Sequence, residues 1–352
     1  MKTPDTSKKA GHYRVATVRD VAERAGVAPG TVSNVLTGRR PVAEGLRQLV
    51  LKAVEALDYH PNHVAASLRL QQTRSIGIVV PDLTNPFFSA FVRHVEELAA
   101  ESNYQILLVG SNESKSREAD RVRTLIARRI DGLIIAPTQD DVGETMGDAG
   151  GLPPTVLVDR AIDTEEFDVI GADNFDAGYC GARHLLELGH RDIALAVTAA
   201  GLANIRERIE GYRHAMTEAG LADRVQLIHG GLTIDSCRES VLHQLMGERR
   251  PSAIFATAYV ATLGAIQAIR GTSLVFPEDI SLLGFDDFEW MTALRPYIST
   301  LRQPIHEIAA NAWNLLHARL VGEVNGHLRV RLPCTLEVRE STCPPSTVRS
   351  GQ

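Results

Sequence analysis

The stretch TVRDVAERAGVAPGTVSNVLTG, residues 17–38, decides how the N-terminal part of the chain folds. Thr17 is a suitable N-cap, and Asp20 follows three residues later as its acidic partner in the first turn. Apolar residues then recur at helical spacing until Gly26, which ends the first helix, and Pro29 suits the first turn of a second. Two short helices joined by a tight turn predict a helix-turn-helix, whose second helix enters the DNA major groove. An ordinary helical hairpin inside a core is the alternative.

The neighbouring segments extend this pair into a headpiece. Residues 1–16 are polar, basic and unpatterned, which predicts a disordered arm. The segment PVAEGLRQLVLKAVEALDYHP carries one apolar stripe and predicts a third helix that is limited by Pro61. We therefore expect a helix-turn-helix domain over residues 17–61. Residues 62–74 follow, with about two turns of marginal helix and a polar linker.

Charge is distributed unevenly along the 352 residues. Residues 1–74 hold 12 Lys/Arg and 6 Asp/Glu, a net of +6, whereas the remainder holds 25 basic and 37 acidic residues, a net of −12. A basic head on an acidic body is typical of a polyanion-binding module attached to another domain.

Composition excludes several classes of protein. No apolar run reaches membrane-spanning length, and the basic N-terminus lacks the apolar core of a secretory signal, so we expect a cytoplasmic protein. The four cysteines contain no CxxC pair, so neither a disulfide framework nor a metal site is expected, and no cofactor is implied.

From residue 75 onward, apolar strands alternate with helical segments, which predicts an α/β fold of two doubly wound parallel lobes with a ligand cleft between them. We expect one effector-binding and dimerisation domain over residues 75–342. Its first lobe should comprise about 75–173 with 303–325, its second lobe about 174–300 with 327–342, and residues 343–352 should form a loose tail. The predicted strands are 75–81, 105–109, 132–136, 155–159, 193–197, 225–229, 252–256, 280–285, 327–332 and 335–339.

Several motifs together resemble one family. These are VRDVAERAGVAPGTVSNVLTG, YHPNHVAASLR, RSIGIVVPDLTNPFF, RRIDGLII, ELGHRDIALA, RERIEGYRHAM, SLLGFDD and LEVRES. In this order they closely resemble the LacI-type (lactose/purine/ribose repressor) family of bacterial transcription factors, from about Thr17 to Thr342. The resemblance implies a helix-turn-helix headpiece on a periplasmic-binding-protein-like pair of lobes.

The resemblance assigns the DNA-binding positions. The base-reading positions are Pro29, Gly30 and Asn34, of which only Asn34 has a side-chain donor. Phosphate contacts fall to Thr17, Thr31 and Ser33. For Thr31 and Ser33 the structural alternative is local capping, which is compatible with both roles. In the hinge segment, Asn62, Leu68 and Arg69 match, and Leu68 matches a leucine that wedges into a base step. Packing of Leu68 on the body is the alternative.

The resemblance also assigns a cleft for a small-molecule effector. An arginine and an aspartate facing a desolvated cleft suit a polyhydroxylated ligand. These two residues are Arg208 and Asp286, and a structural ion pair is the alternative for them. For one of Phe87 and Phe88, core packing is the alternative. The implied effector-binding residues are Phe87, Phe88, Arg160, Asp173, Asn174, Arg206, Arg208, Leu232, Tyr259 and Asp286.

Two positions depart from the family pattern. Leu232 stands where relatives often have a stacking aromatic residue, and Ala258 with Tyr259 replaces a frequent Asn-Asp pair. A ligand common in the family is therefore not transferred to this chain.

The sequence thus predicts a transcriptional regulator, most simply a repressor, that binds double-stranded operator DNA as a homodimer in the cytoplasm, at the nucleoid. Its DNA affinity should depend on a small molecule such as a sugar, with no membrane partner. A binding protein for small molecules alone would need export, and no signal is present. An enzyme is not expected because no nucleophile motif, P-loop or metal-spaced cluster occurs.

Overall fold

The computed structural model describes residues 16–37, 40–59, 72–139, 151–160 and 164–346. The chain divides into two compact units, Met1–Thr73 and Arg74–Gln352, and each is described by itself. Within the described ranges, no helix combines the length and apolarity that a membrane crossing requires.

The described residues of the first unit form three helices: α1 (Val18–Ala25), α2 (Pro29–Thr37) and α3 (Glu44–Ala56). Thr17 and Asp20 form a capping box at the start of α1, because the side chain of each accepts a hydrogen bond from the backbone N–H of the other. Gly26 ends the helix at φ 67°, in the left-handed region that favours glycine. The predicted N-cap, helix stop and second helix start are confirmed.

The headpiece core is small. Val21, Val32 and Val50 are fully buried, one from each helix, and Tyr59 closes the cluster after α3. Most of α3 is exposed, so the three helices share few buried side chains, as expected for so short a domain.

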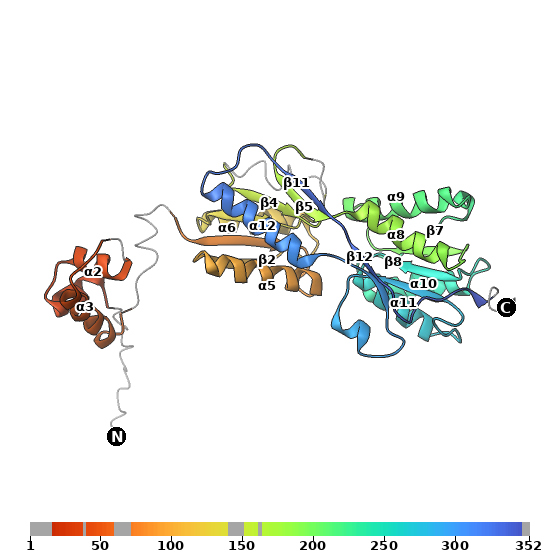
Figure 1. The fold of residues 1–352 in the computed structure, drawn as a ribbon, viewed down its shortest axis with the longest axis horizontal. Coiled ribbons are helices and arrows are strands. Elements are labelled where there is room, and N and C mark those ends of the chain that lie inside the picture. The colour runs from red at the N-terminus through yellow and green to blue at the C-terminus, as the bar shows by residue number, and fades with distance from the viewer. Residues whose placement is uncertain (1–15, 38–39, 60–71, 140–150, 161–163, 347–352) are drawn as a thin grey trace, which may run out of the picture. The chain divides into compact units, whose positions relative to one another are not determined.

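The second unit consists of two lobes, each with a six-stranded sheet (Figure 1). The first lobe contains β1 (Ser75–Val80), α5 (Pro86–Glu101), β2 (Gln105–Gly110), α6 (Lys115–Ala127), β3 (Gly132–Ile135), β4 (Thr155–Val158), β5 (Asp168–Ala172), α12 (Ile305–Leu320) and β11 (Arg329–Leu332). The second contains α8 (Asn174–Glu187), β6 (Ile193–Val197), α9 (Ala203–Glu218), β7 (Gln226–His229), α10 (Ile234–Met246), β8 (Ala253–Ala256), α11 (Tyr259–Arg270), β9 (Ser281–Phe285), β10 (Ser299–Arg302) and β12 (Thr335–Glu337), with short 3-10 helices at Ala222–Arg224 and Glu289–Thr292.

The two sheets have matching strand orders, β11-β5-β4-β3-β1-β2 and β12-β10-β9-β8-β6-β7. The strand pairs of the first sheet are all parallel, for example Ile78 opposite both Leu108 and Ile134. In the second sheet only β12 runs antiparallel, beside β10. The predicted pair of doubly wound lobes is confirmed.

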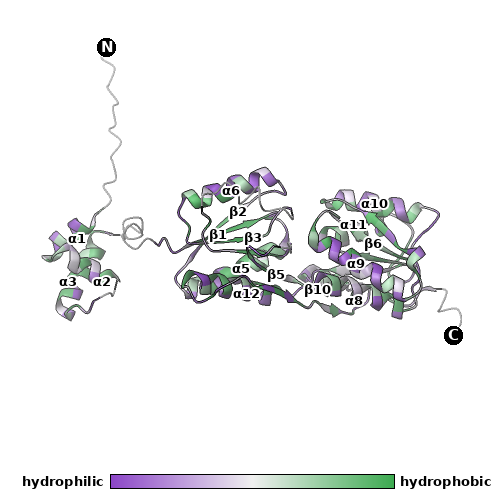
Figure 2. Ribbon diagram, turned by 90° about the horizontal axis from the view of Figure 1, so that it is seen from above, coloured by the Kyte–Doolittle hydropathy of each residue, from purple (hydrophilic) through white to green (hydrophobic). Residues whose placement is uncertain are grey.

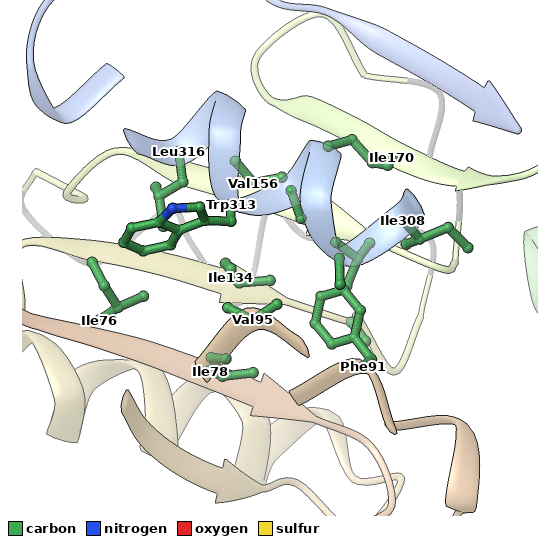
Figure 3. Packing of buried hydrophobic residues seen from close by; sticks show 14 of the residues in the cluster. Ile76, Ile78, Phe91, Val95, Ile134, Val156, Ile170, Ile308, Trp313 and Leu316 are labelled. Carbon is green, nitrogen blue, oxygen red and sulfur yellow. The ribbon is translucent and has the colours of Figure 1, made fainter. Parts of the chain in front are cut away.

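Alternation along the strands explains why helices cover both faces of each sheet. In the first lobe, Ile76 and Ile78 point to a core shared with α5 and α12, whereas Val79 points to the core under α6. Figure 3 shows Trp313 and Leu316 of α12 packed over Ile76 and Ile134, with Phe91 of α5 beside them. The second lobe divides in the same way between a core under α8 and α9 and a core under α10 and α11.

Three expectations need correction. Strands β5 and β10 were missing from the predicted set; both are four or five residues long, and their apolar runs are interrupted by glycine or polar residues. We expected residues 327–342 to complete the second lobe, but β11 pairs with β5 in the first sheet, so the last crossover follows β11. The tail is not loose at Cys343, whose N–H donates to Ser281 Oγ and whose carbonyl accepts from His190.

Candidate functional site

The exposed start of α2 is the candidate DNA-reading surface. Pro29 and Gly30 are exposed, whereas Thr31, Ser33 and Asn34 are partly buried. A Cβ at Gly30 would meet no atom within 4 Å, so none of the described headpiece residues packs against this position. Asn62, Leu68 and Arg69 lie outside the described residues.

Thr17 has a local role. Its hydroxyl donates to Asp20 Oδ2 at 2.7 Å and accepts from Asp20 N at 3.3 Å. The N-cap predicted at Thr17 is therefore confirmed, and the phosphate contact stays a prediction.

The second candidate site is a cleft where the carboxyl ends of the parallel strands of both lobes converge. Such an edge is where open α/β sheets bind ligands. In each lobe, the lining residues directly follow a strand or open the next helix. They are Asp82, Asn85, Phe87, Phe88, Glu113, Asp159, Arg160, Thr198, Leu202, Asn204, Ile205, Arg208, Leu232, Ala258, Tyr259, Val260, Asp286 and Gln303.

Arg160, after β4, is paired within its own lobe. Its two terminal nitrogens donate to the two carboxylate oxygens of Glu113 at 2.8 and 2.7 Å, and one also donates to Pro137 O at 3.1 Å. Burial alone would lower the pKa of Arg160, but the hydrogen bonds and charge of Glu113 outweigh it and raise the pKa above its ordinary value. Of the three side-chain nitrogens of Arg160, Nε has no hydrogen-bond partner among the described residues.

Arg208 lies on the first turns of α9, and no carboxylate among the described residues accepts a hydrogen bond from it. Its Nε donates to Asn174 Oδ1 at 2.9 Å and its Nη1 donates to Thr257 O at 2.5 Å, while the guanidinium carbon lies 3.6 Å from the centroid of the Phe285 ring. Burial lowers the pKa of Arg208, and the nearby Asp159 and Asp286 offset part of this shift. The side chain is thus fixed at its base by neutral acceptors and an aromatic face.

Two buried carboxylates face this arginine, one from each lobe. Asp159 follows β4 and Asp286 follows β9, and both have left-handed backbone, with φ 64° and 67°. Burial raises the pKa of Asp159, although Arg160 and Arg208 counteract it. Burial also raises the pKa of Asp286 to about 6, against hydrogen bonding from Gln303, whose Nε2 lies 2.6 Å from Asp286 Oδ1.

Apolar and aromatic side chains complete the wall. Phe87 and Phe88 meet edge to face with ring centroids 5.1 Å apart, and both line the cleft while also belonging to the first-lobe core. Tyr259 opens α11 in the second lobe, where burial raises the pKa of its hydroxyl. Leu232 is exposed at the rim of the cleft.

Three predicted effector contacts do not reach the lining. Asp173 caps α8 by accepting from Asp176 N at 3.0 Å, and Arg206 is exposed, with its guanidinium donating to Gly201 O. Asn174 is fully buried behind Arg208 and holds its Nε. Asn174 is therefore a positioning residue in this structure, and Asp173 and Arg206 serve the helix ends.

Sequence reasoning missed other lining residues. Asp159 directly precedes the predicted Arg160, and its equivalence to Asp286 at the end of the matching strand would have indicated it. Glu113 and Gln303 come from a turn and from the last crossover, and their roles depend on partners far away in the sequence. The described residues contain no group of three or more His, Cys, Asp or Glu that could hold a metal ion.

Comparison with known proteins agrees with this geometry. Residues 17–62 match the family described as "Bacterial regulatory proteins, lacI family", and residues 182–342 match "Periplasmic binding protein-like domain". Catabolite control protein A of Priestia megaterium is 31% identical over 331 residues, covering 93% of this chain and 99% of that protein.

The chain belongs to the lacI family of bacterial regulatory proteins. It is a DNA-binding transcriptional regulator with an effector-binding core of the periplasmic-binding-protein type.

Solved structures of the same family show the whole architecture. The lac repressor dimer bound to operator and the anti-inducer ONPF matches with a TM-score of 0.86 at 26% identity, covering 94% of this chain and all of that chain. The complex of the transcriptional regulator CelR with cellobiose matches with a TM-score of 0.69 at 28% identity, covering 93% of this chain and 99% of that chain.

Proposed function

We propose that this lacI-family regulator is a homodimeric repressor whose operator affinity is set by a neutral, polyhydroxylated small molecule bound between its lobes. Residues 62–74 would supply the hinge between the headpiece and the core. A dimer with two-fold symmetry would read a palindromic operator with two half-sites. The ligand would act by binding one lobe arrangement more tightly than the other.

One observation carries the proposal for the ligand: Arg208 lies between two carboxylates, one from each lobe, on a chain that also carries a helix-turn-helix. An arginine and two aspartates offer donors and acceptors at fixed places, as hydroxyl groups require. The complex of CelR with cellobiose is a precedent for a sugar in this family.

The charges in the cleft favour a neutral ligand over a phosphorylated or carboxylated one. Arg160 is already paired with Glu113, so Arg208 is the principal cation of the lining that a ligand could bind. Arg208 faces Asp159 and Asp286. A second anion there would add like charge to a desolvated site, which costs free energy.

We propose regulation rather than catalysis, and action in the cytoplasm at the nucleoid. Support comes from relatives that are described as HTH-type transcriptional repressors or regulators.

Selection of bound DNA from a random pool by the full-length protein tests the first half of the proposal. We expect a palindrome with two half-sites, and binding that depends on salt but not on sequence would contradict it.

With the selected duplex as a probe, neutral monosaccharides and disaccharides are then screened against their phosphorylated forms. A shift in affinity with a neutral sugar is the expected result, and a response confined to phosphorylated sugars would overturn the ligand class.

A further inference from the structure

Helix α6 lies on the outside of the first lobe (Figure 2). The helix and its C-cap residue carry a row of solvent-exposed arginines. Arg117, Arg121 and Arg128 are all exposed, and Thr124 fills the remaining place of an i, i+4, i+7, i+11 series. At 100° per residue these four positions fall within about 60° around the helix axis, so they form one stripe about 16 Å long. We call these three arginines the α6 stripe.

The α6 stripe has no acidic partners within the described part of the chain. The only exposed carboxylate on the helix, Asp120, pairs with Arg123 on a neighbouring face, and Glu118 is buried, where it accepts from Thr138 N. Arg117 and Arg121 repel each other at i, i+4 spacing, and Arg117 also lies in the first turn, where the helix dipole disfavours a cation. The arrangement therefore weakens the isolated helix, and an external anion would reverse that effect.

One end of the stripe lies where the chain enters the core from the headpiece. Arg128 is the C-cap of α6, and Asp131, three residues later, donates its N–H to Ser75 O and accepts from Arg74 N. Ser75 begins β1, the first strand after the linker. Residues 60–74 separate the described headpiece from β1, and a chain of that length spans at most about 50 Å.

We infer that the α6 stripe binds the phosphate backbone of duplex DNA that flanks the operator. The inference rests on the proposed operator binding, because the headpiece would hold flanking duplex within reach of the core and raise its local concentration. Arginine suits this task because its planar guanidinium donates two hydrogen bonds to one phosphate.

DNA fits the stripe better than an acidic protein surface does. Protein interfaces have an apolar centre, whereas none of the exposed large apolar side chains lies on α6. Between and beside the arginines the exposed residues are polar or small, such as Ser116 and Thr124. Such a surface makes contacts to phosphates without reading sequence.

The test compares two probes on the full-length protein: the selected operator alone, and the same operator extended by about 15 base pairs on each side, which adds ~50 Å of duplex per side. We expect the extended probe to bind about tenfold more tightly at 50 mM salt. The triple variant Arg117→Gln/Arg121→Gln/Arg128→Gln should lose this gain and keep wild-type affinity for the short probe. Its salt dependence on the long probe should weaken by up to about 3 in log–log slope per subunit.

The control removes the same charge from the second lobe. Arg213, Arg249 and Arg250 are exposed there, and the triple replacement by Gln should keep the gain from flanking DNA. Equal affinity of the wild type for both probes would overturn the inference, as would an equal loss by the stripe and control variants. Failure to bind even the short probe would instead contradict the proposed function, so the two failures are distinguishable.

Discussion

The two lobes of the core share one strand order and treat their cleft arginines differently. Arg160 of the first lobe forms a bidentate ion pair with Glu113. Arg208 of the second lobe instead donates hydrogen bonds to neutral acceptors and packs on an aromatic ring. Their aspartates, in contrast, are equivalent: Asp159 and Asp286 each follow the corresponding strand with left-handed backbone. The comparison indicates that the first arginine builds the wall of the cleft and the second is available to a ligand.

The largest effect should come from Arg208→Ala, which removes the cleft cation that has no carboxylate hydrogen-bond partner among the described residues. We expect loss of at least a hundredfold in effector affinity, because a charge-assisted hydrogen-bonding group disappears from a desolvated site. Operator binding by the ligand-free protein should persist. Effector titration of the operator complex measures both, and Arg208→Lys controls for the loss of positive charge beside Asp159 and Asp286. A normal dose response in Arg208→Ala would remove this residue from the site.

Arg160→Ala should instead act on stability. Deleting one partner of a buried ion pair leaves the Glu113 carboxylate without its cation, which costs about 3 kcal/mol of unfolding free energy. Urea unfolding measures this loss, and Arg160→Ala/Glu113→Gln should recover part of it by removing the stranded charge. If Arg160→Ala left stability unchanged and abolished the effector response, the contrast between the two arginines would be wrong.

The equivalent aspartates predict a dependence on pH. Burial raises the pKa of Asp286 from 3.8 to about 6, so the folded state holds the proton more tightly than the unfolded state does. The resulting gain in unfolding free energy is fully present below about pH 4 and is lost as pH rises through 6. The expected loss is about 3 kcal/mol, since each pKa unit corresponds to ~1.4 kcal/mol.

The free energy of unfolding of Asp286→Asn, measured at pH 4.5 and at pH 7, gives the contribution of this carboxyl group to the pH dependence. The variant should lose less stability over this range than the wild type, and Asp159, whose pKa burial also raises, accounts for part of what is left. The exposed Asp120→Asn is the control and should follow the wild type. An unchanged pH dependence in Asp286→Asn would show that its carboxylate is solvated in the ligand-free protein.

Sequence patterns predicted the headpiece and most strands because their signals are local. Thr17, Gly26 and Pro29 act within one turn, and runs such as 76–80 are apolar throughout because helices cover both faces of the sheet. The family resemblance placed Arg208 and Asp286 in the cleft. The partners of these groups could not be read in the same way: Glu113 meets Arg160 across 47 positions, and Asn174 meets Arg208 across 34. Which arginine is paired and which is available depends on those distant contacts.

Helix packing also distinguishes the lobes, and it gives the smallest expected effect. In the first lobe, large side chains such as Phe91 and Trp313 separate α5 from α12 (Figure 3). In the second, glycines bring the backbones of α8 and α9 together: a Cβ at Gly178 would lie 2.2 Å from Arg208 O, and one at Gly211 would lie 2.0 Å from Phe175 O.

Gly178→Ala must therefore move α9 at the residue that carries the cleft cation. We expect a net loss of about 2 kcal/mol in stability, since overpacking outweighs the gain in helix propensity, together with weaker effector binding. Gly201→Ala, just before α9, is the matched control because a Cβ there meets no atom within 4 Å. If Gly178→Ala lowered stability without changing effector affinity, Arg208 would not depend on this close approach, and its position would be set by Asn174 and Thr257 alone.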